Sequence, residues 1–182
     1  MTARKAGARS SVSLTGGTVA EAPRALRPGC DDAGGMDDPG PAGDDAEKIR
    51  ALIAAYGERL DAGDLDGVAA LFRNATWRSG TRSLTGVATI RAVYDDVILY
   101  DGVPSTRHVL GDVVVEVDGV RATSRCSFTV FQSRPDFPLQ AVLVGRYHDE
   151  FACVDGTWEF RTRVVHADLL GDLSHHMRPS RR

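Results

Sequence analysis

The sequence predicts an α+β fold in which N-terminal helices pack on one face of a curved antiparallel sheet. Two observations lead to this prediction. Between about residues 44 and 98, apolar residues recur at helical spacing. Beyond Pro104, four long β-rich runs follow one another, and Asp-Gly pairs mark tight turns between them. Helices first and strands afterwards is the order of an α+β domain, with the helices on one side of the sheet.

Composition restricts the class of protein. The chain has 182 residues, 42% of them hydrophobic and 26% charged, with a net charge of −3. These values are typical of one globular domain with a tail, and they disfavour nucleic acid or a membrane surface as a partner. Cys30, Cys126 and Cys153 lack metal-ligand spacing, so no zinc site is expected. No signal-peptide core or membrane span is visible, and we expect a cytoplasmic protein.

Three segments are expected along the chain. Residues 1–43 are rich in Gly, Ala, Pro, Ser and Asp without an apolar period, which predicts a disordered tail. Residues 44–173 hold the periodic patterns and form the domain. Residues 174–182 contain three arginines, which predicts a flexible basic C-terminus.

The helical part begins with a capping-box pattern formed by Asp44 and Glu47. An apolar stripe follows at helical spacing, made of Ile49, Leu52, Ile53, Tyr56 and Leu60. Asp64 is expected to cap a short second helix, and Trp77 to begin a short strand. A third helix is expected to carry Ile90, Val93, Tyr94, Val97 and Ile98.

Strands are predicted over residues 107–117, 120–132, 139–154 and 157–169, with a longer loop at 134–138. In the third of these strands, one face carries Leu139, Ala141, Leu143, Gly145, Tyr147 and Phe151. Because successive side chains of a strand point to opposite faces, this face is expected to pack against the helices. A curved sheet around a long helix leaves a concavity at its open end, where binding or chemistry is expected.

Four segments carry a resemblance to a known superfamily: YGERLDAGDLDGVAALF, TGVATIRAVY, TRHVLGDVVVEVDG and VGRYHDEFACVDGTWEFRTRVVH. They resemble the nuclear-transport-factor-2-like (NTF2-like) superfamily, and within it the SnoaL-like branch that includes scytalone dehydratase and hexachlorocyclohexane dehydrochlorinase. The resemblance covers about residues 44–168 and implies a cone-shaped, cystatin-like domain with one apolar pocket. It specifies the reaction only weakly, because this fold hosts many activities.

The resemblance also implies site residues. Asp61 and His108 match the catalytic Asp–His pair of the family, and Arg163 matches an arginine that helps hold the leaving group or developing anion. Trp77 and Tyr147 fall on aromatic pocket positions. Together with Leu143 and Phe128, they would form a flat apolar slot for a cyclic or aromatic substrate.

The chemistry expected of this pair is proton abstraction from carbon. Histidine has a pKa near neutrality, and a carboxylate on its other ring nitrogen fixes the tautomer and stabilises the imidazolium. His108 would be the base and Asp61 its partner, while Tyr56 and Arg163 would hold the departing or developing oxygen. Tyr56 stands where the dehydrochlorinase has a basic residue, which favours a phenol donor as in scytalone dehydratase. The activity expected is that of a dehydratase, isomerase or cyclase that needs no metal or organic cofactor.

Each of these residues also has a purely structural interpretation. Asp61 could be a helix-end residue, His108 a strand histidine, Arg163 a salt-bridged sheet residue and Tyr56 a core residue. His166, Asp168 and the pair His175-His176 suggest metal ligands, but no third ligand is evident and no metal is expected.

Other functions remain open at this stage. A non-catalytic scaffold subunit, as in the β subunits of aromatic-ring-hydroxylating dioxygenases, has the same fold. Epoxide hydrolysis, as in limonene epoxide hydrolase, would need a second inward carboxylate, and none is evident. A homodimer through the outer sheet face is expected, since members of the superfamily commonly pair there and Val142 and Val144 lie on that face.

Overall fold

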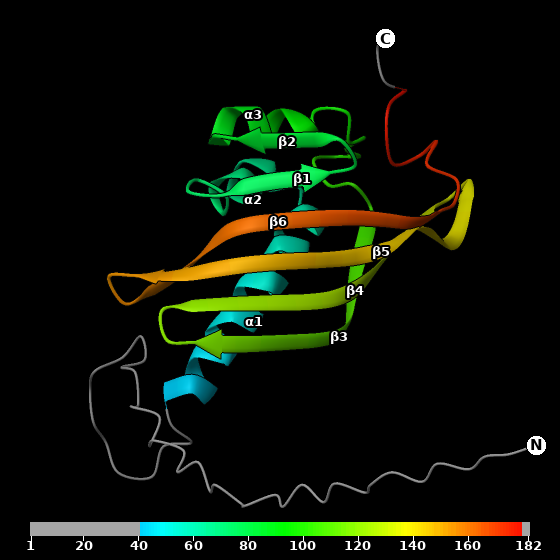
Figure 1. The fold of residues 1–182 in the computed structure, drawn as a ribbon. Coiled ribbons are helices and arrows are strands. Elements are labelled where there is room, and N and C mark those ends of the chain that lie inside the picture. Colours follow the sequence, from blue (N-terminus) through cyan, green and yellow to red (C-terminus); the bar gives the residue numbers. More distant parts are fainter. Residues whose placement is uncertain (1–40, 180–182) are drawn as a thin grey trace, which may run out of the picture.

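The computed structural model describes residues 41–179, which form helices packed on a six-stranded sheet (Figure 1). The α+β prediction is confirmed. Most of the predicted tail, residues 1–40, lies outside the described residues. Within residues 41–179, no helix has the length and apolar character that crossing a membrane requires.

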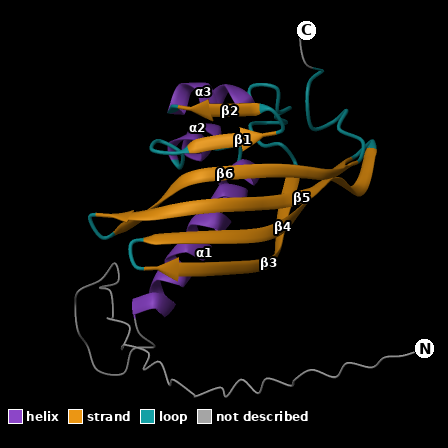
Figure 2. Ribbon diagram, viewed as in Figure 1, coloured by secondary structure: helices purple, strands orange, loops and turns teal. Residues whose placement is uncertain are grey.

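Helix α1 (Pro41–Asp61) runs obliquely across the sheet, as the ribbon coloured by secondary structure shows (Figure 2). Its predicted apolar stripe faces the sheet, and Ile49, Ile53, Tyr56 and Leu60 are buried. Asp44 is not the N-cap, because the helix extends back to Pro41; the Asp44 carboxylate instead pairs with Lys48 at 2.8 Å, one turn further on. The helix therefore ends at the predicted place but begins earlier.

Two short helices follow. Helix α2 (Leu65–Ala70) is capped as predicted, since the Gly67 backbone N–H donates to the Asp64 carboxylate at 2.9 Å. The predicted third helix is shorter than expected, comprising α3 (Val87–Arg91) and the 3₁₀ turn η1 (Ala92–Tyr94). It does not continue to Ile98, because the Ile98 backbone N–H donates instead to the carbonyl of His176 at 2.9 Å.

The sheet has the strand order β2-β1-β6-β5-β4-β3. The strands are β1 (Thr76–Ser79), β2 (Arg82–Thr85), β3 (Thr106–Asp118), β4 (Arg121–Arg134), β5 (Phe137–Val154) and β6 (Thr157–Leu170). All neighbours are antiparallel except β1 and β6, which are parallel. The short strand β2 was not predicted. The predicted loop at 134–138 is a tight turn, because Arg134 and Phe137 still pair with each other.

The four long strands agree with the predicted runs to within two residues at each end. The Asp155-Gly156 hairpin has φ angles of 49° and 78°, the left-handed backbone that Asp-Gly turns adopt readily. A bulge interrupts the alternation in β5: Leu143 pairs with Val130 and Ala141 with Phe131, so Val142 is an extra residue. Val142 is therefore fully buried and Leu139 is 71% exposed, opposite to the predicted faces. Bulges of this kind bend a sheet, which here curves around α1.

The chain after β6 packs back onto the domain. The carbonyl of His175 accepts hydrogen bonds from Gln132 Nε2 and Tyr100 Oη, each at 2.9 Å, and the Arg178 N–H donates to the carbonyl of Asp96 at 2.7 Å. Residues 174–179 therefore make specific contacts, contrary to the flexible C-terminus that their composition suggested. Composition could not reveal these contacts, because their partners are distant in the sequence.

Candidate functional site

A cavity of about 280 Å³ lies between the helices and the concave face of the sheet. All four predicted pocket residues line it: Trp77, Phe128, Leu143 and Tyr147. The phenol ring of Tyr147 stacks on Phe128 with ring centroids 4.2 Å apart. Most of the remaining lining is aliphatic, so the cavity is an apolar site with a few polar groups at its wall.

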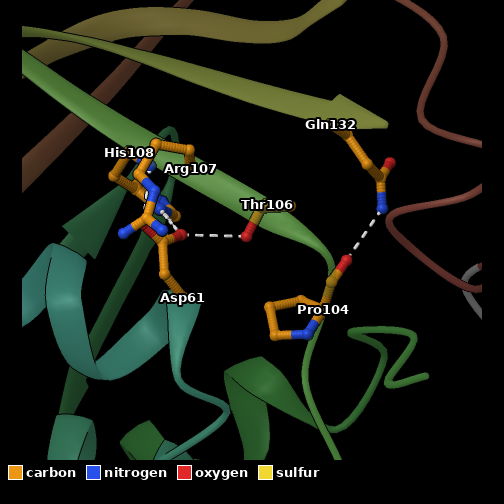
Figure 3. A network of polar contacts seen from close by, with 6 residues as sticks. All are labelled: Asp61, Pro104, Thr106, Arg107, His108 and Gln132. Carbon is orange, nitrogen blue, oxygen red and sulfur yellow. Dashed lines mark hydrogen bonds and ion pairs between the residues drawn. The ribbon is translucent and has the colours of Figure 1, made fainter. Parts of the chain in front are cut away.

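Asp61 and His108 are in direct contact at this wall (Figure 3). Asp61 is the last residue of α1 and His108 lies near the start of β3, and His108 Nδ1 is 2.6 Å from Asp61 Oδ1. Two further donors hold the carboxylate: the Thr106 hydroxyl at 2.9 Å and the His108 backbone N–H at 2.7 Å. Both side chains are more than 90% buried. The carboxylate thereby fixes the imidazole in one orientation.

The contact also selects the tautomer of His108. An ionised carboxylate only accepts hydrogen bonds, so Nδ1 carries a proton, and in the neutral ring Nε2 keeps its lone pair. Because the His108 side chain lines the cavity, Nε2 is the nitrogen that a ligand can contact. Burial raises the pKa of Asp61, but the hydrogen bonds from His108, and the positive charge of that ring when it is protonated, outweigh burial, so the pKa is lowered overall. Asp61 is therefore ionised at neutral pH.

A glycine allows α1 to approach β3 at this point. A Cβ atom at Gly57 would lie only 3.1 Å from the Cβ of His108. This is closer than most Cβ contacts, so a side chain here would require the helix and the strand to shift apart slightly.

Two tyrosines add hydroxyl groups to the cavity. Tyr56 and Tyr94 both line it, and their hydroxyl oxygens are 3.3 Å apart. Burial, and then the neighbouring Tyr56, raises the pKa of Tyr94 well above its usual range. Burial raises the pKa of Tyr147 in the same way. Tyr94 and Tyr147 are therefore neutral phenols at neutral pH.

Arg163 does not reach the cavity wall. Its side chain is fully buried behind the tyrosines, where Nε and Nη2 donate to the two oxygens of Asp149 at 2.9 and 2.6 Å. The guanidinium carbon lies 4.2 Å from the ring centroids of both Tyr56 and Tyr147, within cation–π range. Burial disfavours the cation, but Asp149 more than compensates, so the pKa of Arg163 is raised. The arginine thus contacts the phenol rings, and the direct contact with a leaving group expected from the sequence is not available to it in this arrangement.

Sequence reasoning missed two residues. Asp149 is the second inward carboxylate that was not recognised, although its spacing from Tyr147 and Phe151 places all three on one strand face. It binds Arg163 and does not line the cavity, so it does not form the carboxylate pair that epoxide hydrolysis would use. His176 was assigned to the flexible C-terminus, but its side chain lines the cavity. No local pattern could have indicated this position.

The other histidines lie elsewhere. His166 packs against His148. Asp168, two residues after His166, binds the Arg146 guanidinium at 2.8 and 2.9 Å on an exposed part of the sheet. Over residues 41–179, no group of three His, Cys, Asp or Glu side chains is arranged to hold a metal ion.

Comparisons with known proteins give the same fold. Residues 42–164 match the family model of the SnoaL-like domain. An NTF2-like protein with a cystatin-like fold from Novosphingobium aromaticivorans is 27% identical, with a TM-score of 0.59, over 73% of this chain and 92% of that one. No protein of curated function matches the sequence.

Two further solved structures from the same organism are similar at 20% identity, a level that shows the fold alone. One is the β subunit of a candidate aromatic-ring-hydroxylating dioxygenase, with a TM-score of 0.60 over 75% of this chain and 97% of that one. The other is a candidate scytalone dehydratase, with a TM-score of 0.58 over 70% and 87% respectively.

The Asp149–Arg163 pair yields a stability prediction. Replacing Asp149 by Leu leaves a buried guanidinium without its counter-ion, so we expect the free energy of unfolding to fall by about 3–5 kcal/mol. The double variant Asp149→Leu/Arg163→Met replaces the whole pair by apolar groups and should recover most of this loss. Urea unfolding followed by circular dichroism measures both values. A single variant as stable as the wild type would contradict the role given to the pair.

The position of His176 yields a pH prediction. Burial, and then the charge of His108, lowers the pKa of His176 to about 4 in the folded protein, whereas the unfolded value is about 6.5. Between these values the unfolded chain binds one proton more, so stability falls as the pH drops from about 6.5 to 4, by up to roughly 1 kcal/mol per pH unit. The variant His176→Phe should lose this part of the slope. Urea unfolding at pH 7 and pH 4.5 compares the two proteins, and equal slopes would show that His176 is not buried in neutral form.

Proposed function

This chain belongs to the SnoaL-like domain family of the NTF2-like superfamily, as its sequence segments predicted, and on that premise we propose that it is a cofactor-independent lyase or isomerase. Its substrate would be a small cyclic or aromatic metabolite. The observation that carries the proposal is the Asp61–His108 contact at the wall of an apolar cavity. A buried histidine with one nitrogen bound to a carboxylate and the other facing a ligand site is arranged for general base catalysis.

The proposed reaction begins at the free nitrogen of His108. Nε2 takes a proton from a carbon of the substrate, and the electrons of that C–H bond form a new carbon–carbon double bond. In a dehydration, the C–O bond to a neighbouring hydroxyl breaks, and the oxygen leaves as water with the proton that the His108 imidazolium returns to it. In an isomerisation, the proton returns to a different carbon. Asp61 stabilises the imidazolium that forms in either case.

The tyrosines supply hydrogen bonds to the oxygen on which negative charge develops. Tyr56 and Tyr94 present neighbouring hydroxyls at the cavity, and a neutral phenol is a hydrogen-bond donor. In this proposal Arg163 acts through the tyrosines, because its guanidinium faces the rings of Tyr56 and Tyr147 and does not line the cavity. Such interactions are strong in a site that excludes water.

The shape of the cavity supports the proposed substrate class. Trp77, Phe128 and Tyr147 provide flat apolar surfaces, and the volume of about 280 Å³ suits a molecule of one to three rings. A substrate in this slot would be held mainly by apolar contact, with its polar atoms directed toward the hydroxyl and imidazole groups.

A scaffold role is the second candidate. The likeness to the β subunit of a candidate ring-hydroxylating dioxygenase favours it, and the exposed side chains of Leu139, Leu169 and Leu170 offer apolar surface for a partner or for a second copy of this chain. A homodimer through the outer sheet face is compatible with either function. The buried Asp61–His108 pair favours the enzyme over the scaffold, because a scaffold does not need an oriented base at a cavity.

Proton abstraction can be tested before the natural substrate is known. Bicyclic ketones such as 2-tetralone carry acidic C–H groups, and a base in the cavity would catalyse their exchange with D₂O. We expect the wild type to accelerate deuterium uptake, and His108→Gln to reduce this acceleration by at least about 100-fold, since general base assistance typically contributes about 10²–10⁴-fold. Proton NMR follows the exchange.

The matched control is His148→Gln, since His148 is an exposed histidine on the face of β5 that points away from the cavity. This variant should exchange at the wild-type rate. If His108→Gln is as active as the wild type, or if the wild type exchanges no ketone of a small panel, the proposed base is wrong.

The scaffold role makes a different prediction. A scaffold subunit should co-purify from its native source with a larger oxygenase subunit, whereas the proposed enzyme should purify as a dimer of this chain alone. Size-exclusion chromatography with light scattering gives the mass. A stable complex with a larger subunit, together with no exchange activity, would favour the scaffold.

A further inference from the structure

The C-terminal segment contributes a second imidazole to the cavity, separate from the Asp61–His108 pair. His176 follows β6 by only six residues in the sequence, yet its side chain lines the same cavity as His108. The proposed base needs only one imidazole. This cavity has two, which come from different parts of the chain.

The backbone on both sides of His176 is held in place. Its N–H donates to the carbonyl of Leu173 at 2.9 Å, and its carbonyl accepts from Ile98 N–H at 2.9 Å. Gln132 Nε2 donates to the carbonyl of His175, and Gln132 also binds the carbonyl of Pro104 at 3.0 Å (Figure 3). Gln132 thus joins the C-terminal segment to the chain just before β3. These hydrogen bonds position His176 relative to His108.

The two ring nitrogens of His176 differ. Nδ1 is enclosed and has no hydrogen-bond partner among the described residues. Nε2 makes no hydrogen bond to residues 41–179 and is not enclosed, so it is the nitrogen that a ligand can reach. An enclosed N–H without an acceptor is costlier than an enclosed lone pair, which places the proton of the neutral ring on Nε2. The ring therefore presents a hydrogen-bond donor to the cavity.

We propose that His176 Nε2–H binds a carbonyl or hydroxyl oxygen of the ligand and so orients it relative to His108. The inference deepens the proposed function, and it rests on that function only in taking this cavity as the substrate site. It narrows the ligand class to ring compounds that carry a carbonyl or hydroxyl oxygen. His176 is in this view a specificity residue, since it contacts an oxygen and exchanges no proton.

A matched pair of probes tests this hydrogen bond without catalysis. 2-Tetralone and tetralin have nearly the same shape, but only the ketone has an oxygen acceptor. NMR titration followed at the indole signals of Trp77 gives the dissociation constant of each probe at pH 7. We expect the wild type to prefer the ketone by about three- to tenfold, the size of one net hydrogen bond.

Variants assign the preference to His176. In His176→Phe the ratio of the two dissociation constants should fall to about one, while tetralin should bind about as well as before. His176→Gln keeps a side-chain N–H donor and should retain part of the preference. His148→Phe, on the opposite face of the sheet, should leave the ratio unchanged. Thermal unfolding of each variant confirms that it is folded.

Two outcomes would overturn the inference: a preference in His176→Phe equal to that of the wild type, or no preference in the wild type. The result is independent of the exchange experiment with His108. A ketone preference that depends on His176, together with no deuterium exchange, would support the binding role of His176 and contradict only the proposed base.

Discussion

The contact between the end of α1 and the start of β3 determines the geometry of the whole site. One carboxylate, that of Asp61, receives hydrogen bonds from Thr106, from the His108 backbone and from the His108 ring. The same hydrogen bonds that join helix to sheet also set the tautomer of the imidazole. Gly57 favours this close approach, because a Cβ atom at that position would lie only 3.1 Å from the Cβ of His108.

The interior behind the cavity is unusual in containing a charged pair. Arg163 and Asp149 neutralise each other, and four aromatic rings surround the guanidinium within 6 Å. Rings packed on a rigid planar cation have little freedom to move, so Tyr56 and Tyr147 present a well-defined surface to the cavity. The Asp149–Arg163 pair orders the base of the pocket, while the Asp61–His108 pair and the tyrosine hydroxyl groups supply its polar chemistry.

How much the sequence could predict depended on how far apart the interacting residues are. The Asp155-Gly156 hairpin and the Asp64 cap are local, and both were predicted. Asp149 was also predictable, because strand alternation alone places it beside Tyr147. Asp61 and His108 were paired only through resemblance to a family, since 46 intervening residues separate them. The bulge at Val142, the early end of α3 and the position of His176 depend on contacts between distant segments, which no local spacing reveals.

The return of the C-terminal segment to the cavity has a practical consequence for handling this protein. Pro179, the last residue that the structure describes, lies three residues after His176, so a sequence attached to this segment would begin near the cavity wall. A polyhistidine purification tag in that position would bring additional imidazoles to a place where two already lie. Enzymatic and binding measurements are therefore better made on protein that carries its tag at the other end, before the 40 residues that precede the first helix.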